Sequence, residues 1–429
     1  MVHPGPNGST GARYDPRMDI AGPVKIAVIG LGGYAGDIID LVLDLGARTT
    51  PAVVLDAVCA PGLKDPSNRI AELSRRGVTV YGSYEEVLAL PDVEAVWLPV
   101  PIDLHVPFAM QALDAGKAVM VEKPVAGTVD ELDALIAARD AAGLPVAVGF
   151  QDIYDGLMVP TKHRLLSGEL GRVVKATVHG CWPRNEAYFR RADWAGRTKV
   201  RGRWVLDSPV NNAMAHFVNT ALFLMGSDQE SSAVPRQIEA ELYRVNAIEN
   251  YDLASLRIGL HDSIEMLVLL THGCQESVGP VVRIDTERGH VAWTPDGVVV
   301  EAAGETTRTH RGDGMRTRML ERFAGAVRGR SVPGTTLASL EVARSHALVV
   351  SGASEASPVH PVPADHKVRI DSDDGVLHAV PDIEQVFAHC AQTGQMLHAS
   401  GRLGFTSEPG SLDLVGYRRF GGLPAPAGR

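Results

Sequence analysis

The sequence predicts an α/β fold in which an N-terminal doubly wound parallel sheet is followed by a C-terminal α+β domain with a large open antiparallel sheet. Short apolar runs alternate with helical patterns from residue 24 to about residue 150, which is typical of a parallel sheet covered by helices. Beyond residue 150 the apolar runs are longer and alternate with polar residues, above all between residues 171 and 302. This second pattern favours antiparallel strands with one covered face.

The first domain is expected to span residues 23–150, with right-handed crossovers between its strands. Its expected strands are Val24–Ile29, Ala52–Cys59, Val78–Tyr81, Ala95–Pro99, Val119–Val121 and Val146–Gly149. One helix is expected directly after the first strand, and the others at Tyr84–Leu90, Pro107–Ala115 and Val129–Ala142. The last two should stop at Gly116 and Gly143, because glycine is the usual residue in the left-handed turn after a helix.

The second domain is expected to span residues 151–375, and residues 376–429 to form a C-terminal extension. Its expected strands are Arg172–Gly180, Gln237–Tyr243, Ala254–Leu260, Ser263–Leu270, Val281–Asp285 and His290–Thr294. Expected helices are Thr161–Ser167, Arg316–Arg328, Leu337–Ser354 and, in the extension, Ile383–Leu397. Residues 1–22 are rich in glycine and proline and lack the apolar core of a signal peptide, so they are expected to be a flexible lead-in.

Composition excludes several classes of protein. A net charge of −10 argues against a binder of nucleic acid or of a membrane surface, both of which need basic patches. No apolar run is long enough to span a bilayer. The four cysteines are widely scattered without a C-x-x-C pair, so neither a metal site nor a disulfide framework is expected. Free thiols fit a cytoplasmic location.

A glycine-rich turn follows the first strand, in the sequence Gly30-Leu31-Gly32-Gly33-Tyr34-Ala35. Gly30, Gly32 and Gly33 form a G-x-G-x-x-A pattern between a strand and a helix. Such a turn lets backbone N–H groups and the helix N-terminus meet a pyrophosphate. The pattern therefore predicts a Rossmann-type dinucleotide site at the start of the first domain.

The residues after the second strand bear on the choice between NAD and NADP. A fold that prefers NAD usually places an acid at the end of this strand to bind the ribose hydroxyls, and here that position is Ala60. Asp56 is the alternative acceptor, at the right distance from the glycine motif but inside the apolar run. Lys64, or Arg69 farther on, could meet a 2′-phosphate, although a solvated surface residue is the simpler explanation of Lys64. The expected cofactor is NAD or NADP, without a strict preference for NAD.

The strand Val119–Val121 runs directly into Glu122, Lys123 and Pro124. Proline ends a strand because it has no N–H for the ladder and restricts the residue before it. Glu122 and Lys123 therefore lie at the carboxyl end of a parallel strand, the edge that faces the ligand crevice in such sheets. A lysine at this edge can donate a hydrogen bond to a substrate hydroxyl. Considered without the rest of the chain, Glu122 and Lys123 are more simply explained as an ion pair on the surface.

The segment from residue 201 to residue 216 carries Asp207, Asn212 and His216. Asn212 and His216 are four residues apart, so on a helix they share one face, and Asp207 would cap or precede that helix. Both residues could also lack a catalytic role. His216 would then be hydrogen-bonded to a backbone carbonyl, and Asp207 would only cap the helix.

The same part of the chain is unusually aromatic and basic. Three tryptophans precede the expected helix, namely Trp182, Trp194 and Trp204. They either form a wall for a sugar ring or, as is commoner for tryptophan, pack in the core. Six arginines lie here, namely Arg184, Arg190, Arg191, Arg197, Arg201 and Arg203. Their charge favours an anionic substrate, a cofactor-phosphate face or an oligomer contact.

In this order the motifs resemble the glucose–fructose oxidoreductase, inositol dehydrogenase and rhizopine-catabolism family (Gfo/Idh/MocA). The resemblance covers roughly residues 24 to 355 and rests on four segments, namely Gly30–Ala35, Glu94–His105, Ala115–Pro124 and Ser167–Gly171. It implies a nicotinamide-dependent oxidoreductase acting on a sugar, cyclitol or related polyol. It also implies a substrate-binding second domain whose sheet mediates a homodimer or homotetramer.

The resemblance also assigns residues. It implies that the pyrophosphate loop consists of Gly30, Gly32, Gly33 and Tyr34. It implies that Pro101 and His105 belong to the loop on the nicotinamide side, and that Glu122 and Lys123 contact the cofactor and the substrate. The family's aspartate and the histidine four residues later admit two registers. Anchoring on Asp207 puts Asn211 in the histidine position. Anchoring on His216 puts Asn212 in the aspartate position and needs about one extra helical turn. Gln151 and Asp152 stand where the family often carries an arginine.

The leading hypothesis is an NAD(P)-dependent dehydrogenase in which Lys123 binds the reacting hydroxyl and His216 exchanges its proton, within a site that includes Asp207 and Asn212. A second hypothesis is a redox-assisted glycosidase or lyase that keeps NAD tightly bound and returns the hydride after a neighbouring bond has eliminated. A third is a catalytically inactive, cofactor-binding regulator, suggested by the irregular segment that ends at His216.

Overall fold

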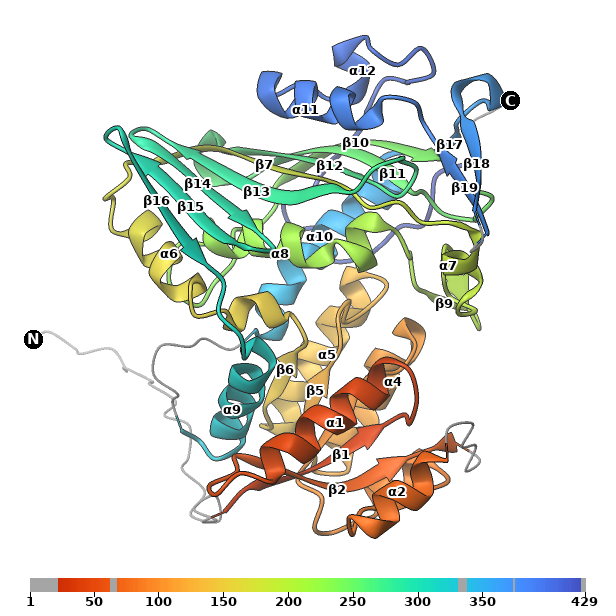
Figure 1. Cartoon of the computed structure of the whole chain (residues 1–429), viewed down its shortest axis with the longest axis vertical. Helices are drawn as coiled ribbons and strands as arrows, with labels where there is room; N and C mark the ends of the chain where they lie inside the picture. Colours follow the sequence, from red (N-terminus) through yellow and green to blue (C-terminus); the bar gives the residue numbers. More distant parts are fainter. Residues whose placement is uncertain (1–21, 62–67, 331–337, 373–374, 426–429) are drawn as a thin grey trace, which may run out of the picture.

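The computed structural model describes residues 22–61, 68–330, 338–372 and 375–425. Within them the chain forms a parallel-sheet domain and a second domain built on a much larger sheet (Figure 1). Apart from Gly22, the expected lead-in lies outside the described residues, and so does Lys64.

The first domain is a six-stranded parallel sheet with the order β3-β2-β1-β4-β5-β6, which confirms the doubly wound prediction. Its strands are β1 (Val24–Ile29), β2 (Val53–Cys59), β3 (Thr79–Tyr81), β4 (Ala95–Leu98), β5 (Ala118–Val121) and β6 (Val146–Val148). Its helices are α1 (Tyr34–Gly46), α2 (Arg69–Arg75), α3 (Tyr84–Leu88), α4 (Ile102–Asp114) and α5 (Val129–Ala142). The order reverses between β1 and β4, and the crevice at this switch point is where such folds bind ligands.

Helix α4 begins five residues before the expected start at Pro107. Pro101 is its N-cap, and Pro107 lies inside the helix. The prediction was wrong because proline is favoured in the first turn, where a missing N–H costs nothing, and so Pro107 marked the wrong start. Inside the helix its missing N–H leaves only the Asp103 carbonyl without its usual partner. The earlier start places His105 on the first turn of α4.

The second domain is built on a ten-stranded sheet whose main path runs β16-β15-β14-β13-β7-β12-β11-β10-β17, with β20 also paired to β10. The strands are β7 (Val173–Cys181), β10 (Gln237–Arg244), β11 (Leu253–Gly259), β12 (Glu265–Thr271), β13 (Val278–Thr286), β14 (Gly289–Thr294), β15 (Gly297–Ala302), β16 (Glu305–His310), β17 (Val359–Pro361) and β20 (Gly410–Asp413). Most neighbours are antiparallel, as predicted, but β7 pairs with β12 and β10 with β17 in parallel, so the sheet is mixed.

Shorter elements complete the chain. Helices of the second part are α6 (Met158–Leu166), α7 (Glu186–Arg190), α8 (Ala215–Leu224), α9 (Met315–Val327), α10 (Leu340–Ala356), α11 (Ile383–Thr393) and α12 (Leu397–Ser400). The 3-10 turns are η3 (Gln151–Tyr154), η5 (His261–Ser263) and η6 (Ala364–His366), and η4 (Pro209–Ala213) is π-helical. Two small hairpins are β8 (Lys199–Val200) with β9 (Arg203–Trp204), and β18 (Val368–Ser372) with β19 (Gly375–Ala379).

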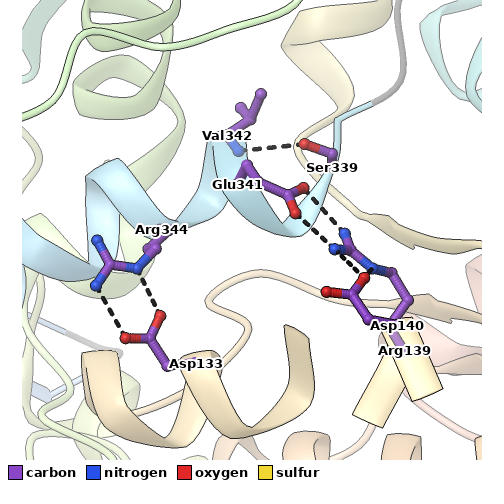
Figure 2. A network of polar contacts seen from close by, with 7 residues as sticks. All are labelled: Asp133, Arg139, Asp140, Ser339, Glu341, Val342 and Arg344. Carbon is purple, nitrogen blue, oxygen red and sulfur yellow. Dashed lines mark hydrogen bonds and ion pairs between the residues drawn. The ribbon is translucent and has the colours of Figure 1, made fainter. Parts of the chain in front are cut away.

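Helix α10 returns from the second domain and packs on α5 of the first (Figure 1). Figure 2 shows that the two helices are joined by two-pronged ion pairs of opposite polarity. Arg139 of α5 holds Glu341 at 2.6 and 3.0 Å, and Arg344 of α10 holds Asp133 at 2.5 and 2.9 Å. Because each helix supplies one cation and one anion, a slip of α10 along α5 breaks both pairs at once.

The two faces of the large sheet are covered by different parts of the chain, because side chains alternate along a strand. On β12, Met266, Val268 and Leu270 join the main core together with α8 and α10, whereas Leu267 and Leu269 face the other way. The second face is covered by α11 and α12 (Figure 1), whose apolar side chains form a separate core with it. The expected single helix Ile383–Leu397 was wrong, because Gly394 adopts a left-handed conformation (φ 71°) that ends α11.

Candidate active site

A cavity of about 560 Å³ lies where the carboxyl ends of β1, β4 and β5 meet the second domain. Its lining includes predicted residues from both domains, namely Gly32, Tyr34, Pro101, His105, Glu122, Lys123, Asn212 and His216. Of the other predicted site residues, Gly30 and Gly33 lie in the same loop as Gly32, and Asp207 lies behind Asn212. The structure thus brings together four separate segments of the sequence, at residues 30–34, 101–105, 122–123 and 207–216.

The glycine loop has the shape of a phosphate cradle. Gly30 (φ 129°) and Gly33 (φ 57°) adopt backbone conformations that favour glycine. A Cβ atom at Gly30 would lie 2.9 Å from the Cβ of Ala35, whereas one at Gly32 would meet no atom within 4 Å and would enter open space. No side chain caps the N-terminus of α1. The residues present therefore fit a pyrophosphate held by backbone N–H groups at a helix N-terminus.

Tyr34 and Arg316 flank this end of the cavity. The Arg316 guanidinium lies 5.4 Å from the centre of the Tyr34 ring, and its Nε donates to Gln151 Oε1 at 2.9 Å. Burial raises the pKa of Tyr34 well above its usual range, so its hydroxyl stays protonated and can donate. Arg316 belongs to α9, so the second part of the chain supplies a cation to the cofactor end of the site.

Glu122 is held in a buried position at the end of β5. It is 6% exposed and accepts a hydrogen bond from Trp97 Nε1 at 3.0 Å. Burial raises its pKa. A Cβ atom at Gly149 would lie 2.6 Å from Glu122 Oε2, so only glycine at the end of β6 leaves room for this carboxyl group. The neighbouring Lys123–Pro124 peptide is cis.

Lys123 begins a short chain of polar contacts across the domain boundary. Its Nζ donates to the backbone oxygen of Asn212 at 2.7 Å and to Asn212 Oδ1 at 3.1 Å. Asn212 Nδ2 in turn donates to Asp207 Oδ1 at 2.9 Å, and Asp207 Oδ2 accepts from the N–H of Gly196 at 2.6 Å. Burial lowers the pKa of Lys123 and raises the pKa of Asp207. The ammonium group is thus fixed by the asparagine, and the asparagine by the aspartate.

A π-helical turn brings Asn212 and His216 to the same cavity. Ser208 caps this turn, η4, through its Oγ and the N–H of Asn211, so Asp207 precedes the helix without capping it. Met214 (φ −112°) breaks the helix before α8 begins at Ala215. The register that is anchored on His216 runs through this wider turn. Asn211, the histidine equivalent in the other register, is buried and donates to Val205 and Leu206 carbonyls.

His216 is half-buried against the edge of Phe150, with 5.7 Å between ring centres, and its Nδ1 has no hydrogen-bond partner. Burial, with the charge of Lys123 as the next cause, lowers the pKa of His216 well below its usual range. The imidazole is therefore neutral at neutral pH and can accept a proton. A histidine with a purely structural role would be hydrogen-bonded to a backbone carbonyl, and Nδ1 of His216 has no such partner.

His105 connects two loops of the site. Its Nδ1 lies 2.6 Å from the Pro124 oxygen and its Nε2 lies 2.9 Å from the Val100 oxygen. Burial lowers the pKa of His105 to about 4, so the neutral ring donates to one carbonyl at a time. His105 ties the turn after β4 to the turn after β5 and so positions Lys123.

The sequence indicates Trp194 and Arg191 only as members of the aromatic and basic run after β7, and it does not indicate Tyr188. Tyr188, Arg191 and Trp194 line the cavity. The other tryptophans pack elsewhere, Trp182 against Phe217 and Trp204 against Phe420. Composition marked the run as unusual, but only the fold separates the members that reach the cavity from those that do not. Asn250 was also missed, and its Nδ2 supports the Asp207 backbone oxygen at 3.0 Å.

The carboxyl end of β2 carries no acid. Ala60 follows the strand directly and is buried, as the strand boundaries predicted. Asp56 lies at a bulge in the middle of β2 and pairs with Lys25 at 3.7 Å. Arg69 opens α2 and pairs with Asp40.

The parallel sheet and its glycine loop form a Rossmann-type dinucleotide-binding domain, and comparison with known proteins gives the family that this domain resembles. Residues 24–150 match the Gfo/Idh/MocA model, described as an oxidoreductase family with an NAD-binding Rossmann fold. The match covers the first domain and agrees with the resemblance to this family that the sequence motifs indicate.

Individual relatives extend the comparison. The chain is 46% identical over 87 residues to an uncharacterized oxidoreductase of Rhizobium meliloti, covering 20% of this chain and 26% of that one. It is 27% identical to D-xylose 1-dehydrogenase (NADP⁺) 2 of Haloferax volcanii, covering 63% of this chain and 81% of that one. The chain spans 26% and 60% of the length of the first two curated relatives it matches.

Solved structures share the fold. An inositol dehydrogenase homolog from Azotobacter vinelandii, complexed with NADH and myo-inositol, has a TM-score of 0.62 at 18% identity and covers 77% of this chain and 94% of its own. In the part of the chain that the structure describes, no helix has the length and apolar character to cross a membrane.

Proposed function

We propose that this chain is an NAD(P)-dependent oxidoreductase that transfers a hydride between a nicotinamide cofactor and a hydroxyl or ketone of a sugar, cyclitol or related polyol. One observation carries the proposal. Lys123 and His216, a charged donor and a neutral proton acceptor, line one cavity with the glycine loop. The names of the relatives, which include a xylose and an inositol dehydrogenase, support the substrate class.

Gly30, Gly32, Gly33 and Tyr34 would hold the cofactor's pyrophosphate, with Arg316 adding a cation. Pro101, His105 and Glu122 would border the nicotinamide. When bound, the nicotinamide accepts or supplies the hydride, and the protein contributes orientation and charge.

Lys123 would bind the reacting oxygen. Its ammonium group already donates to the backbone oxygen and to Oδ1 of Asn212, so its position is fixed before a substrate binds. A fixed donor stabilises the negative charge that develops on an alcohol oxygen, and it does so more strongly in a site shielded from water. Asp207 would act through Asn212 by holding the amide in its present orientation.

His216 would take the hydroxyl proton during oxidation and return it during reduction. Its neutral ring and the unpaired Nδ1 suit that role. A proton on His216 next to Lys123 is unfavourable, so the transfer is expected to be completed only while the alcohol loses its hydride.

The test begins with mass spectrometry of the cofactor carried by the purified chain. A panel of sugars, cyclitols and sugar acids is then read at the nicotinamide absorbance band. A steady absorbance change with one class of substrate supports a dehydrogenase. Bond cleavage without net cofactor turnover would instead support the redox-assisted glycosidase or lyase. If no compound changed the absorbance, the catalytically inactive regulator would be the remaining hypothesis.

Three further expectations belong to this proposal. Residues 151–375 bind substrate, and residues 376–429 form an extension. The chain forms a homodimer or homotetramer through the part of the large sheet that α11 and α12 leave uncovered, and light scattering of the full chain tests this. A cytoplasmic location is supported by the four cysteines, which are unpaired and buried.

A further inference from the structure

The cavity carries a positive charge that the proposed chemistry does not use. Its charged lining residues are Lys123, Arg191, Arg316 and Glu122, that is, three cations and one acid whose pKa is raised by burial. Arg316 lies beside the glycine loop, where a cofactor phosphate would meet it. Arg191 comes from the other domain and has no comparable task.

Arg191 is held in place by aromatic rings. Its guanidinium carbon lies 3.6 Å from the centre of the Tyr188 ring and 4.8 Å from the centre of the Trp194 ring. Its Nη1 also donates to the backbone oxygen of Tyr188 at 2.6 Å. Arg184 approaches the same Tyr188 ring at 4.6 Å and adds a second positive charge. A stacked guanidinium loses little freedom when it binds a ligand, so it is ready for an anion.

Arg191 also lacks an anionic partner. Among the residues that the structure describes, no carboxylate lies within ion-pair distance of it. Its neighbours in the basic run differ, since Arg190 pairs with Glu186 at 3.1 Å and Arg201 pairs with Asp103 through two bonds of 2.8 Å. These two arginines are neutralised by carboxylates, whereas Arg191, which lines the cavity, has no carboxylate partner among the described residues.

Arg191 and Lys123 line the same cavity. Burial is the main cause that lowers the pKa of Lys123, and the charge of Arg191 lowers it further. The same charge opposes the rise that burial causes in the pKa of Asp207. An anionic group next to Arg191 would therefore lie within the reach of one substrate molecule whose hydroxyl meets Lys123.

We propose that the substrate carries an anionic substituent, a carboxylate or a phosphate, and that Arg191, stacked on Tyr188 and Trp194, is the residue that binds it. This inference rests on the proposed function, because it places the anion beside the reacting hydroxyl. Arg191 is a specificity residue, since it selects the substrate without taking part in the hydride or proton transfer.

The test uses the full chain saturated with NAD⁺ and three compounds that share one ring, namely D-glucose, D-glucuronate and D-glucose 6-phosphate. Binding is followed by tryptophan fluorescence, which Trp194 should report, and turnover by nicotinamide absorbance. We expect one or both anions to bind about tenfold more tightly than D-glucose, the lower end for a charge-assisted contact because Arg191 is exposed. The carboxylate and phosphate arms tell which anion the site takes.

The matched variants are Arg191→Gln and Arg190→Gln, adjacent positions that lose the same charge. Arg191→Gln should bring the anions to the affinity of D-glucose and leave the dissociation constant for NAD⁺ unchanged, while Arg190→Gln should keep the preference. The inference is overturned if none of the three compounds binds, if D-glucose binds as well as the anions, or if Arg191→Gln keeps the preference. Turnover of D-glucose without anion preference would retain the proposed function alone. Anion binding that depends on Arg191, without turnover, would retain only the anion site.

Discussion

The lysine at the end of β5 offers the sharpest test of the site, because the same strand has a second buried lysine at its other end. Lys123 follows the carboxyl end and lines the cavity, whereas Lys117 precedes the amino end. Lys117 Nζ donates to the Leu90 and Val93 oxygens at 2.6 and 2.7 Å, so each lysine serves two acceptors. Lys123→Met and Lys117→Met remove the same charge and keep a similar apolar stem.

The magnitudes follow from these contacts. Either substitution leaves acceptors without a donor, which costs about 1–3 kcal/mol of stability. Relief from burying a charge offsets part of this cost in both variants. Only Lys123→Met removes the donor that we propose for the reacting oxygen, and loss of such a donor typically lowers kcat by about 10²- to 10³-fold. The two variants should therefore be alike in stability and very different in turnover.

The measurements are thermal unfolding and the rate of nicotinamide absorbance change with whichever substrate the panel identifies. The catalytic role of Lys123 is refuted if Lys123→Met keeps wild-type turnover. It is equally refuted if Lys117→Met loses as much turnover, since the effect would then come from the loss of structure. Cofactor binding by both variants, measured by fluorescence, shows that the glycine loop is intact.

Three other results are expected. Gly32→Val should weaken cofactor binding without lowering the unfolding temperature, because a Cβ atom at this position points into the open space of the loop and has no protein atom within 4 Å. An unchanged dissociation constant would disprove the loop assignment. Ala60→Asp should weaken NADP relative to NAD, because the added carboxylate repels a 2′-phosphate, and titration of both cofactors checks this. Burial raises the pKa of Glu241 from 4.5 to about 7. The folded state therefore binds this proton more tightly, and its contribution of about 3 kcal/mol is complete below pH 4.5 and is lost as the pH rises through 7. Glu241→Gln should flatten the unfolding free energy across that window, and a wild-type slope in the variant would disprove the assignment.

The parallel-sheet domain could be predicted almost completely from the sequence. Its strands are short apolar runs closed by Gly, Pro or charged residues, and α5 has the predicted bounds because Gly143 marks its end. The same local logic failed at Pro107, which is tolerated inside α4, and at Gly394, where a continuing apolar pattern hid a left-handed break. Local patterns set the type of an element more firmly than its ends.

The site could be predicted in its parts but not in its connections. The motifs marked Lys123, Asn212 and His216, yet no pattern in the sequence shows that a π-helical turn lets Asn212 hold the lysine. Arg191 and its neighbour Arg190 have the same residue type and the same local context. The pair of Arg190 with Glu186 is a local contact, four residues apart on α7, whereas only the tertiary structure turns Arg191 to the cavity.

Strand β10 has a consequence for the order in which the chain can finish folding, because its outer side is covered only by the late strands β17 and β20. Residues 237–240 of β10 pair with β20, and residues 242–244 pair with β17. Synthesis proceeds from the N-terminus, so about 170 residues must follow before Gly410–Asp413 can cover this edge. Until then β10 presents unpaired backbone groups to any other strand, including the same strand of a second nascent chain. The ribosome-bound intermediate is therefore the state in which this protein is most exposed to mispairing, and deletion of β20 would make that state permanent.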